Sequence, residues 1–477
     1  MKKAVLEYID NNAALFTDVS HKIWDFAELS LKENESAKLY CDVLAENGFT
    51  VEKELCGVKT AFSGSYGSGK PIIAILGEFD ALSGLSQRAA STKREELVKG
   101  GSGHGCGHNM LGAGALAAAF AVKEYLEKSG TAGTVIFYGC PGEEGGAGKA
   151  FMARERLWEK VDAALTWHPS DVNEVATGTC NSCIQVLYKF KGVASHAAGD
   201  PEHGRSALDA VELMNIGVQF LREHMSSDAR VHYSIIDGGG VSPNVVQPTA
   251  SVLYMVRSTK VSEAVELAKR VDKIADGAAL MTETSYEKVF IDGTANTVPN
   301  HTLETLLWKN MNEIGVPTYA EEDIVYAAEL KKTYPKNNLP SISAKFDPAI
   351  KAQVAKLSEN GEKPLNDFLV PQYSGYAFEA GSTDVGDVSW LTPTAQFYAV
   401  GFTSGAPGHS WQNVSCGASQ IGDKAVIYAG KVLACAVIDL FENSEILAAA
   451  KEEFKLAAAE GYTCPIPDGE EPKAIEF

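Results

Sequence analysis

The stretch Pro71-Ile-Ile-Ala-Ile-Leu-Gly-Glu-Phe-Asp80 decides the fold of this chain. An unbroken apolar run that ends in carboxylates is typical of a strand buried on both faces, and such strands occur in parallel sheets covered by helices. Thr134–Cys140 and Val161–Trp167 repeat the pattern. Because helical periodicity separates these runs, we predict an α/β fold with a mostly parallel sheet.

Predicted helices alternate with these strands. Residues 2–48 contain two helical patterns, and Asn109–Lys128 is rich in alanine and glycine, which permit close packing on a sheet. Further helices are predicted at 147–158, 301–314, 417–441 and 443–459, and a further strand at 394–400. The polar, glycine-bearing stretch 83–103 is predicted to be a loop over the functional site.

After residue 180 the order of elements changes. Strands are predicted at 182–191, 230–237, 250–258 and 286–292, with helices at 205–224 and 262–281. This βαββαβ order is that of a ferredoxin-like unit. We therefore predict a catalytic α/β domain made of residues 1–180 and 300–477, interrupted by an α+β domain at 181–299. Residues 330–380 show no clear periodicity and are left unassigned.

The composition limits the partners of the protein. A chain of 477 residues with 45% hydrophobic and 22% charged residues is large enough for two globular domains. Its net charge of −20 disfavours nucleic acid and anionic membranes as partners. The sequence has no apolar run long enough to span a membrane, no secretory pattern at its N-terminus and nine scattered cysteines. We therefore expect a cytoplasmic protein.

Side chains that can bind metal ions follow the predicted strands. In an open α/β sheet, ligands bind at the carboxyl ends of the strands, where several loops converge. The residues found there are Glu78, Asp80, Glu143, Glu144, His168 and His409. The sequence Gly-His-Gly-Cys-Gly-His-Asn at 103–109 adds Cys106 and His108, which an extended backbone would direct to the same side.

These residue types favour a metal-dependent hydrolase. Zinc and manganese accept imidazole, carboxylate and thiolate ligands, and the helix after Cys106 is expected to favour its thiolate. The candidate ligands are Cys106, His108, Glu144, His168 and His409. Because five ligands exceed the four of one tetrahedral zinc, we predict a pair of divalent ions. Glu143 would then remain free for proton transfer.

Each residue also has an interpretation without metal. The glutamate pair could cap the helix that follows it, and Cys106 could be a buried thiol. A single histidine after a strand is most often structural. A shared metal site is favoured because the candidates recur at the same end of successive strands.

Five motifs carry a family resemblance. They are Gly-Cys-Gly-His-Asn at 105–109, Pro-Gly-Glu-Glu-Gly-Gly at 141–146, Trp-His-Pro at 167–169, Ser-His-Ala-Ala at 195–198 and Gly-His-Ser at 408–410. The chain resembles the M20 family of metallopeptidases and amidohydrolases, and most closely its subfamily D of aminoacylase-like enzymes, from about residue 5 to about residue 460. The resemblance implies a metallopeptidase-like catalytic domain in which the five candidate ligands hold two ions, Mn²⁺ or Zn²⁺.

The resemblance also implies a mechanism. Water between the ions would lose a proton to Glu143, which would later hand that proton to the departing amine. Asp80 stands where an acid orients a ligand. Burial and neighbouring carboxylates are expected to raise the pKa of Glu143. The implied substrate is an N-acyl amino acid or dipeptide-like molecule with a free carboxylate, such as an acyl-glutamate.

In the family, the inserted domain is a lid that also forms the dimer interface. The resemblance implies that His196 reaches the partner's active site to stabilise the oxyanion, the alternative being an ordinary surface histidine. Asn244 and Arg257 match lid positions that bind the substrate's carboxylate, although a solvated arginine is an equal alternative. We expect a homodimer through the lid, with a heteromer of two related subunits as the alternative.

Some features leave other interpretations open. Asn109 replaces an aspartate of the family pattern, and Glu78 stands where aspartate is common. The roles of Asp384 and Asp387 are left open. A rival function is an amidase with Cys106 as nucleophile and a histidine base. A further rival is a non-catalytic partner subunit of a hydrolase.

Overall fold

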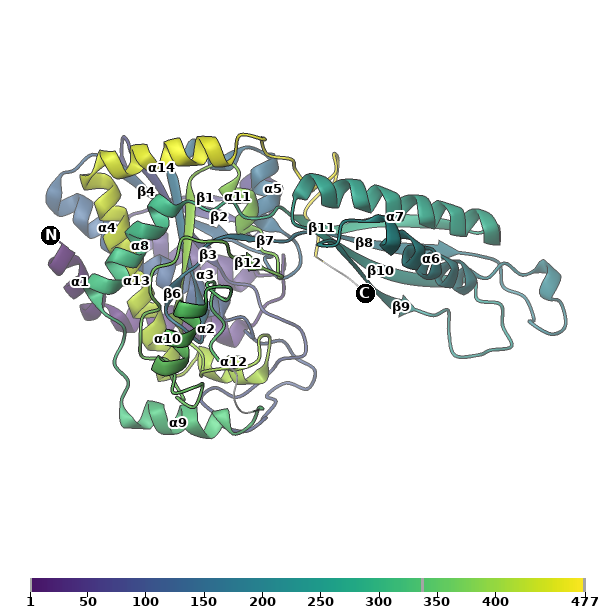
Figure 1. Ribbon diagram of the computed structural model, residues 1–477, viewed down its shortest axis with the longest axis horizontal. Coiled ribbons are helices and arrows are strands. Elements are labelled where there is room, and N and C mark those ends of the chain that lie inside the picture. Colours follow the sequence, from purple (N-terminus) through teal and green to yellow (C-terminus); the bar gives the residue numbers. More distant parts are fainter. Residues whose placement is uncertain (1, 336–338, 475–477) are drawn as a thin grey trace.

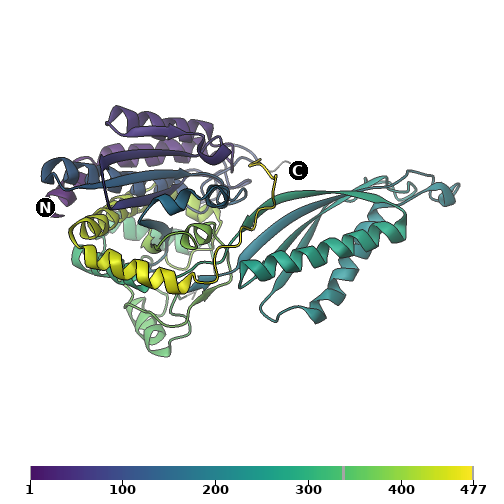
Figure 2. The same cartoon turned by 90° about the horizontal axis from the view of Figure 1, so that it is seen from above.

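The computed structural model describes residues 2–335 and 339–474. Figure 1 shows a broad body and a narrow lobe that projects from it, and Figure 2 shows the same arrangement from above. Residues 1, 336–338 and 475–477 of the predicted catalytic domain lie outside the described residues. Within the described residues, every helix is too short or too polar to cross a membrane.

The body is built on a seven-stranded sheet in the order β1-β2-β4-β3-β5-β13-β6. Its central strands are β4 (Gly133–Cys140), β3 (Ile72–Glu78), β5 (Ala163–Ser170) and β13 (Thr394–Val400), all paired in parallel. The outer strands are β1 (Thr50–Lys53), β2 (Phe62–Ser68) and β6 (Glu174–Val175), which pair antiparallel. The parallel core is therefore confirmed, while the sequence did not indicate the antiparallel edges.

Helices cover both faces of this sheet. Ile73 and Ile75 of β3 face a core shared with α4 (His108–Ser129) and α13 (Gln420–Glu442). Ala74 and Leu76 face a second core that includes α5 (Gly148–Arg154). The other helices of the body are α1 (Lys2–Asn11), α2 (Ala13–Phe26), α3 (Asn34–Glu46), α8 (His301–Ile314), α9 (Glu321–Lys331), α10 (Pro348–Leu357), α11 (Val385–Ser389), α12 (Trp411–Gly417) and α14 (Ser444–Ala457). Burial on both faces explains why β3 is apolar throughout.

The lobe is a four-stranded antiparallel sheet in the order β11-β8-β10-β9. Its elements are β8 (Ser182–Lys191), α6 (Ala207–Leu221), β9 (Arg230–Asp237), β10 (Thr249–Ser258), α7 (Val261–Thr282) and β11 (Ser285–Thr294). This βαββαβ order is the predicted ferredoxin-like one. Strand β9 forms a free edge of the sheet. The domain boundaries at 181 and 299 stay a prediction.

Several expected elements differ from the structure. The stretch 330–380 contains α10 and β12 (Phe378–Glu379), which pairs in parallel with β7 (Thr179–Cys180). The helix predicted at 147–158 is too long, because Arg156 adopts a left-handed φ of 59° and separates α5 from a short 3-10 turn. Residues 83–103 contain no regular helix or strand among the described positions, as predicted.

Replacement of Gly112 tests the close packing of α4 on the end of β3. A Cβ atom there would lie 2.8 Å from the carbonyl oxygen of Glu78 and would collide with the Tyr40 hydroxyl. We expect Gly112→Ala to lower the free energy of unfolding by about 1–3 kcal/mol, the usual cost of overpacking. The control Gly277→Ala adds its Cβ to open space in α7 and should stabilise by up to about 1 kcal/mol. Thermal denaturation compares the two, and equal effects would contradict this packing.

Candidate metal centre

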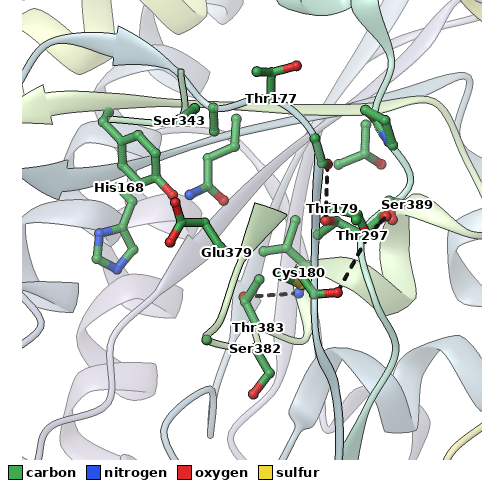
Figure 3. Close-up of a pocket in the computed structure, with 18 of the residues that line it drawn as sticks. His168, Thr177, Thr179, Cys180, Thr297, Ser343, Glu379, Ser382, Thr383 and Ser389 are labelled. Carbon is green, nitrogen blue, oxygen red and sulfur yellow. Dashed lines mark hydrogen bonds between the residues drawn. The ribbon is translucent and has the colours of Figure 1, made fainter. Parts of the chain in front are cut away.

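The candidate site is a pocket of about 330 Å³ at the carboxyl ends of the parallel strands (Figure 3). Among its lining residues are Glu78, Cys106, Glu143, Glu144, His168 and His409. Cys106 precedes α4, and the other five lie in or after a central strand. The fold therefore brings the predicted residues to one place.

Asp80 joins the two loops that carry candidate ligands. Its Oδ1 lies 2.9 Å from His108 Nδ1, and its Oδ2 accepts a 2.9 Å hydrogen bond from the backbone N–H of Glu144. Ser30 donates a third hydrogen bond at 2.7 Å. Burial alone would raise the pKa of Asp80, but its contacts with His108 lower it. Asp80 is thus an ionised acceptor that fixes the His108 ring, as carboxylates do for metal-bound histidines.

Among the described residues, four groups of three side chains could each hold a metal ion, and two of them share Cys106. Of these two, one consists of Cys106, His108 and His168, the other of Cys106, Glu144 and His409. A third group, Glu78, His108 and Glu143, lies beside them, and the fourth, Asp200, Glu202 and His203, is exposed on the lobe. Within each group the candidate ligand atoms lie within 4.8 Å of one another. Cys106 Sγ lies 3.4 Å from His168 Nε2, and His409 Nε2 lies 3.5 Å from Glu144 Oε1. Because Cys106 belongs to both groups, its sulfur could bridge two ions.

Two buried atoms support this assignment. Counting only described residues, His108 Nε2 and Glu144 Oε1 are buried and have no hydrogen-bond partner. Buried polar atoms are normally hydrogen-bonded, so unpaired atoms in a cluster of metal-binding side chains fit a bound cation. Imidazole, carboxylate and thiolate are also the ligands that zinc and manganese accept. The residues present therefore fit a pair of divalent ions.

The local backbone has unusual geometry on both sides of the pocket. His409 has a φ of 50°, a conformation that costs a non-glycine residue about 1–3 kcal/mol. Gly107, between Cys106 and His108, has a φ of 79°. A Cβ atom at Gly107 would lie 2.7 Å from the Pro169 side chain, so this turn requires glycine.

Glu143 lies beside the two ligand groups that share Cys106. Its Oε2 is 3.9 Å from His108 Nε2, and its side chain is 13% exposed. Burial, and then the carboxylates of Glu78 and Glu144, raise the pKa of Glu143 well above its usual value. This is the direction predicted for a general base.

Cys106 corrects one expectation. The helix after it was expected to favour the thiolate, but burial and the carboxylate of Glu144 raise the pKa of the Cys106 thiol well above its usual value. Burial is the larger of these two effects. A cation bound beside the sulfur would favour the thiolate that a metal ligand requires.

A buried lysine at this site was missed by the sequence analysis. Lys149 Nζ lies 2.7 Å from Glu78 Oε1 and 2.5 Å from Asp384 Oδ1, and all three side chains are almost inaccessible to solvent. Burial alone would lower the pKa of Lys149, but Asp384 and Glu78 raise it. Glu78 Oε2 in turn lies 3.3 Å from His108 Nε2. Asp384 and Glu78, left uncertain from the sequence, therefore belong to one ion network beside the candidate metal ligands.

Two further uncertain residues have structural partners instead. Asn109 Nδ2 donates a 2.8 Å hydrogen bond to the carbonyl oxygen of Gly417. Asp387 accepts hydrogen bonds from the backbone N–H of Ala295 at 3.0 Å and from the Tyr462 hydroxyl at 2.7 Å. Both side chains therefore join chain segments and do not take part in the ligand groups.

Three predicted residues lie on the lobe. His196 follows the last residue of β8, and Asn244 precedes the first residue of β10, Thr249. The two residues lie on neighbouring loops at that end of the lobe. Arg257 lies at the opposite end of β10 and donates a 3.1 Å hydrogen bond to Ser382, which lines the pocket. The strand from Thr249 to Arg257 is about 26 Å long at about 3.3 Å per residue. Within one chain, Asn244 and Arg257 therefore lie at opposite ends of β10, too far apart to bind the same small ligand.

Comparison with known proteins defines the class of this protein. Residues 74–435 match the peptidase family M20/M25/M40. The chain belongs to this family, and it is an enzyme of the amidohydrolase and peptidase type. It is 42% identical to one of the subunits of p-aminobenzoyl-glutamate hydrolase from Escherichia coli (strain K12), over 98% of both chains. The resemblance inferred from the motifs is confirmed.

Solved structures share the fold. An aminobenzoyl-glutamate utilization protein from Klebsiella pneumoniae matches with a TM-score of 0.56 at 16% identity, over 88% of this chain and 97% of that one. A Bacillus subtilis M20 peptidase described as dinuclear metal binding matches with a TM-score of 0.54 at 17% identity, over 92% and 99%. These likenesses confirm the predicted α/β architecture with its separate antiparallel sheet.

Replacement of Lys149 tests the buried ion network. Lys149→Met would leave the Glu78 and Asp384 carboxylates buried without a cation, which is expected to lower the free energy of unfolding by about 3–5 kcal/mol. The control Lys128→Met removes an exposed lysine paired with Glu124 and should leave the melting temperature nearly unchanged. Denaturant unfolding measures both variants. Equal stability of the two would contradict the role of Lys149.

Proposed function

We propose that this enzyme hydrolyses the amide bond of an N-acyl amino acid or dipeptide-like molecule with a free carboxylate, and that acyl-glutamates such as p-aminobenzoyl-glutamate are its substrates. The observation that carries the proposal is the pair of ligand groups sharing Cys106 at one pocket. The name of the relative at 42% identity supports the substrate class.

The cofactor of this proposal is a pair of divalent ions, Mn²⁺ or Zn²⁺. Bound ions of this kind activate water and polarise a carbonyl group. The residues that would hold them are Cys106, His108, Glu144, His168 and His409. Asp80 keeps the His108 ring in place through its 2.9 Å contact with Nδ1.

Glu143 is the general base of the proposed reaction. Its raised pKa means that its carboxylate accepts a proton from water readily and holds it. Glu143 belongs to neither group that shares Cys106, although it forms a third possible ligand group with Glu78 and His108. We assign it to proton transfer and not to metal binding. The same carboxyl group then gives the proton to the leaving amine.

A second copy of the chain would complete the site. His196 and Asn244 lie on the lobe, away from the pocket of their own chain. The lobe has a free edge at β9 and exposed apolar side chains, among them Phe220 at 71% and Ile235 at 46% exposure, which a partner would cover. We therefore favour a homodimer through the lobe, with the partner's His196 donating to the oxyanion.

Arg257 would bind the free carboxylate of the substrate. Its hydrogen bond to the pocket residue Ser382 puts the guanidinium at the pocket edge nearest the lobe. A guanidinium can bind a carboxylate through two parallel hydrogen bonds. The partner's Asn244 would contribute from the other side.

Two alternatives remain within the family. The relative's name describes one subunit of a hydrolase, which supports a heteromer with a related chain as the second possibility. A purely non-catalytic subunit is disfavoured, because this chain keeps all five candidate ligands and Glu143. The nine free cysteines support a reducing location, and we propose the cytoplasm.

Replacement of Glu143 tests the general base. Glu143→Ala is expected to reduce turnover of p-aminobenzoyl-glutamate by roughly 10²–10⁴-fold, the usual contribution of proton transfer, without loss of metal. Elemental analysis gives the metal content, and chromatography of released glutamate gives the rate. The control Glu144→Ala removes a ligand and should lose metal as well as activity. Undiminished turnover by Glu143→Ala would rule out the base.

Complementation tests the contribution of His196. His196→Ala is expected to lower kcat with an unchanged melting temperature, since the side chain is exposed. Subunits of His196→Ala and Glu143→Ala, each strongly impaired alone, should regain about a quarter of wild-type activity after dissociation and reassembly in equal amounts. The reason is that half of the dimers are mixed and each mixed dimer has one complete site. No recovery in demonstrably mixed dimers would contradict the shared site.

A further inference from the structure

The pocket wall is acidic beyond the candidate metal ligands. The described lining residues include five glutamates and two histidines, and no lysine or arginine. Glu78, Glu143 and Glu144 belong to the metal centre and its ion network. Glu304 is buried and already hydrogen-bonded to neighbouring side chains. The fifth glutamate, Glu379, belongs to neither set.

The Glu379 carboxylate has capacity for a ligand. Glu379 lies in β12, where parallel pairing with Cys180 of β7 fixes its backbone. Lys345 Nζ lies 3.2 Å from its Oε1, and no described residue hydrogen-bonds to its second oxygen. The side chain is 45% exposed, and in Figure 3 its carboxylate points toward the side of the pocket where His168 lies.

Tyr398 relates Glu379 to the metal centre. The Tyr398 and His168 ring centroids are 6.3 Å apart in an edge-to-face arrangement. Tyr398, Glu379 and His168 all line the pocket. Glu379 therefore belongs to the same pocket wall as a candidate metal ligand.

Two parts of the pocket wall differ in charge. At the edge nearest the lobe, Ser382 contacts the Arg257 guanidinium. Toward His168, Glu379 presents a carboxylate oxygen to which no described residue donates a hydrogen bond. A substrate with its own carboxylate at the Arg257 end would extend its acyl group toward Glu379.

We propose that Glu379 selects substrates whose acyl group carries an N–H donor, as an aminobenzoyl group does. The inference rests on the proposed function and names the part of the substrate that this end of the pocket recognises. The second oxygen of Glu379 accepts a hydrogen bond from the amino group. An unsubstituted ring would cover the same carboxylate and leave its second oxygen without a partner, which lowers affinity.

The test compares ligands that differ only by the amino group. Dissociation constants of 4-aminobenzamide and benzamide, and kcat/KM for p-aminobenzoyl-glutamate and benzoyl-glutamate, are measured on the metal-loaded full chain. Wild-type protein is expected to prefer the amino compounds by about 10- to 100-fold, the usual range for a hydrogen bond to a charged group. Glu379→Leu should reduce this ratio to about one by weakening only the amino compounds.

Controls separate recognition from structure. Glu362→Leu removes an exposed acid of the same chain segment that does not line the pocket, and it should keep the wild-type ratio. Glu379→Gln keeps the shape of the side chain and should give an intermediate ratio, which is measurable even if Glu379→Leu does not fold. A wild-type ratio of one, an unchanged ratio in the folded Glu379 variants, or an equal loss for both ligands would overturn the proposal. Preferential binding without hydrolysis of either glutamate would refute the proposed function and leave the role of Glu379 intact.

Discussion

The contact between Asp80 and His108 is the constraint on which the site depends. Asp80 comes two residues after the end of β3, and its two oxygens bind the His108 ring and the backbone of Glu144. Two loops that each carry a candidate ligand are thereby fixed to one strand. Because His108 Nδ1 is occupied by Asp80, only Nε2 is left to face the other ligands.

The density of negative charge explains much of the remaining chemistry. Glu78, Asp80, Glu143 and Glu144 are held close together, and Lys149 is the buried cation that contacts the first of them. Repulsion between carboxylates and burial together raise the pKa of Glu143. A pair of divalent ions would offset this repulsion and would also activate water. The same ions would therefore stabilise the folded site and supply the catalytic chemistry.

The sequence was most informative where burial and chain direction act together. The apolar runs at β3, β4 and β5 predicted a parallel sheet, and the carboxyl ends of such strands necessarily meet at one edge. That rule predicted that Glu144, His168 and His409 lie close together, and in the structure all three line one pocket.

Other features could not be predicted, for physical reasons. Lys149 lies in the short helix α5, and its charge is paired with Asp384, more than two hundred residues away along the chain. Helix α9 was missed because it has no single apolar face, since Ile324 and Val325 are both exposed. Sequence motifs also do not show which copy of a chain supplies a side chain to a site. The separation of Asn244 from Arg257 by the length of β10 was therefore evident only in the structure.

The most direct measurement of the central claim is a crystal structure of the protein grown with manganese, with anomalous diffraction recorded at the manganese edge. The account predicts two anomalous peaks per chain, one beside His108 and His168 and one beside Glu144 and His409, with Cys106 Sγ between them. Peaks elsewhere, or a fully ordered pocket without any peak at saturating manganese, would contradict the proposal that these side chains share a pair of ions.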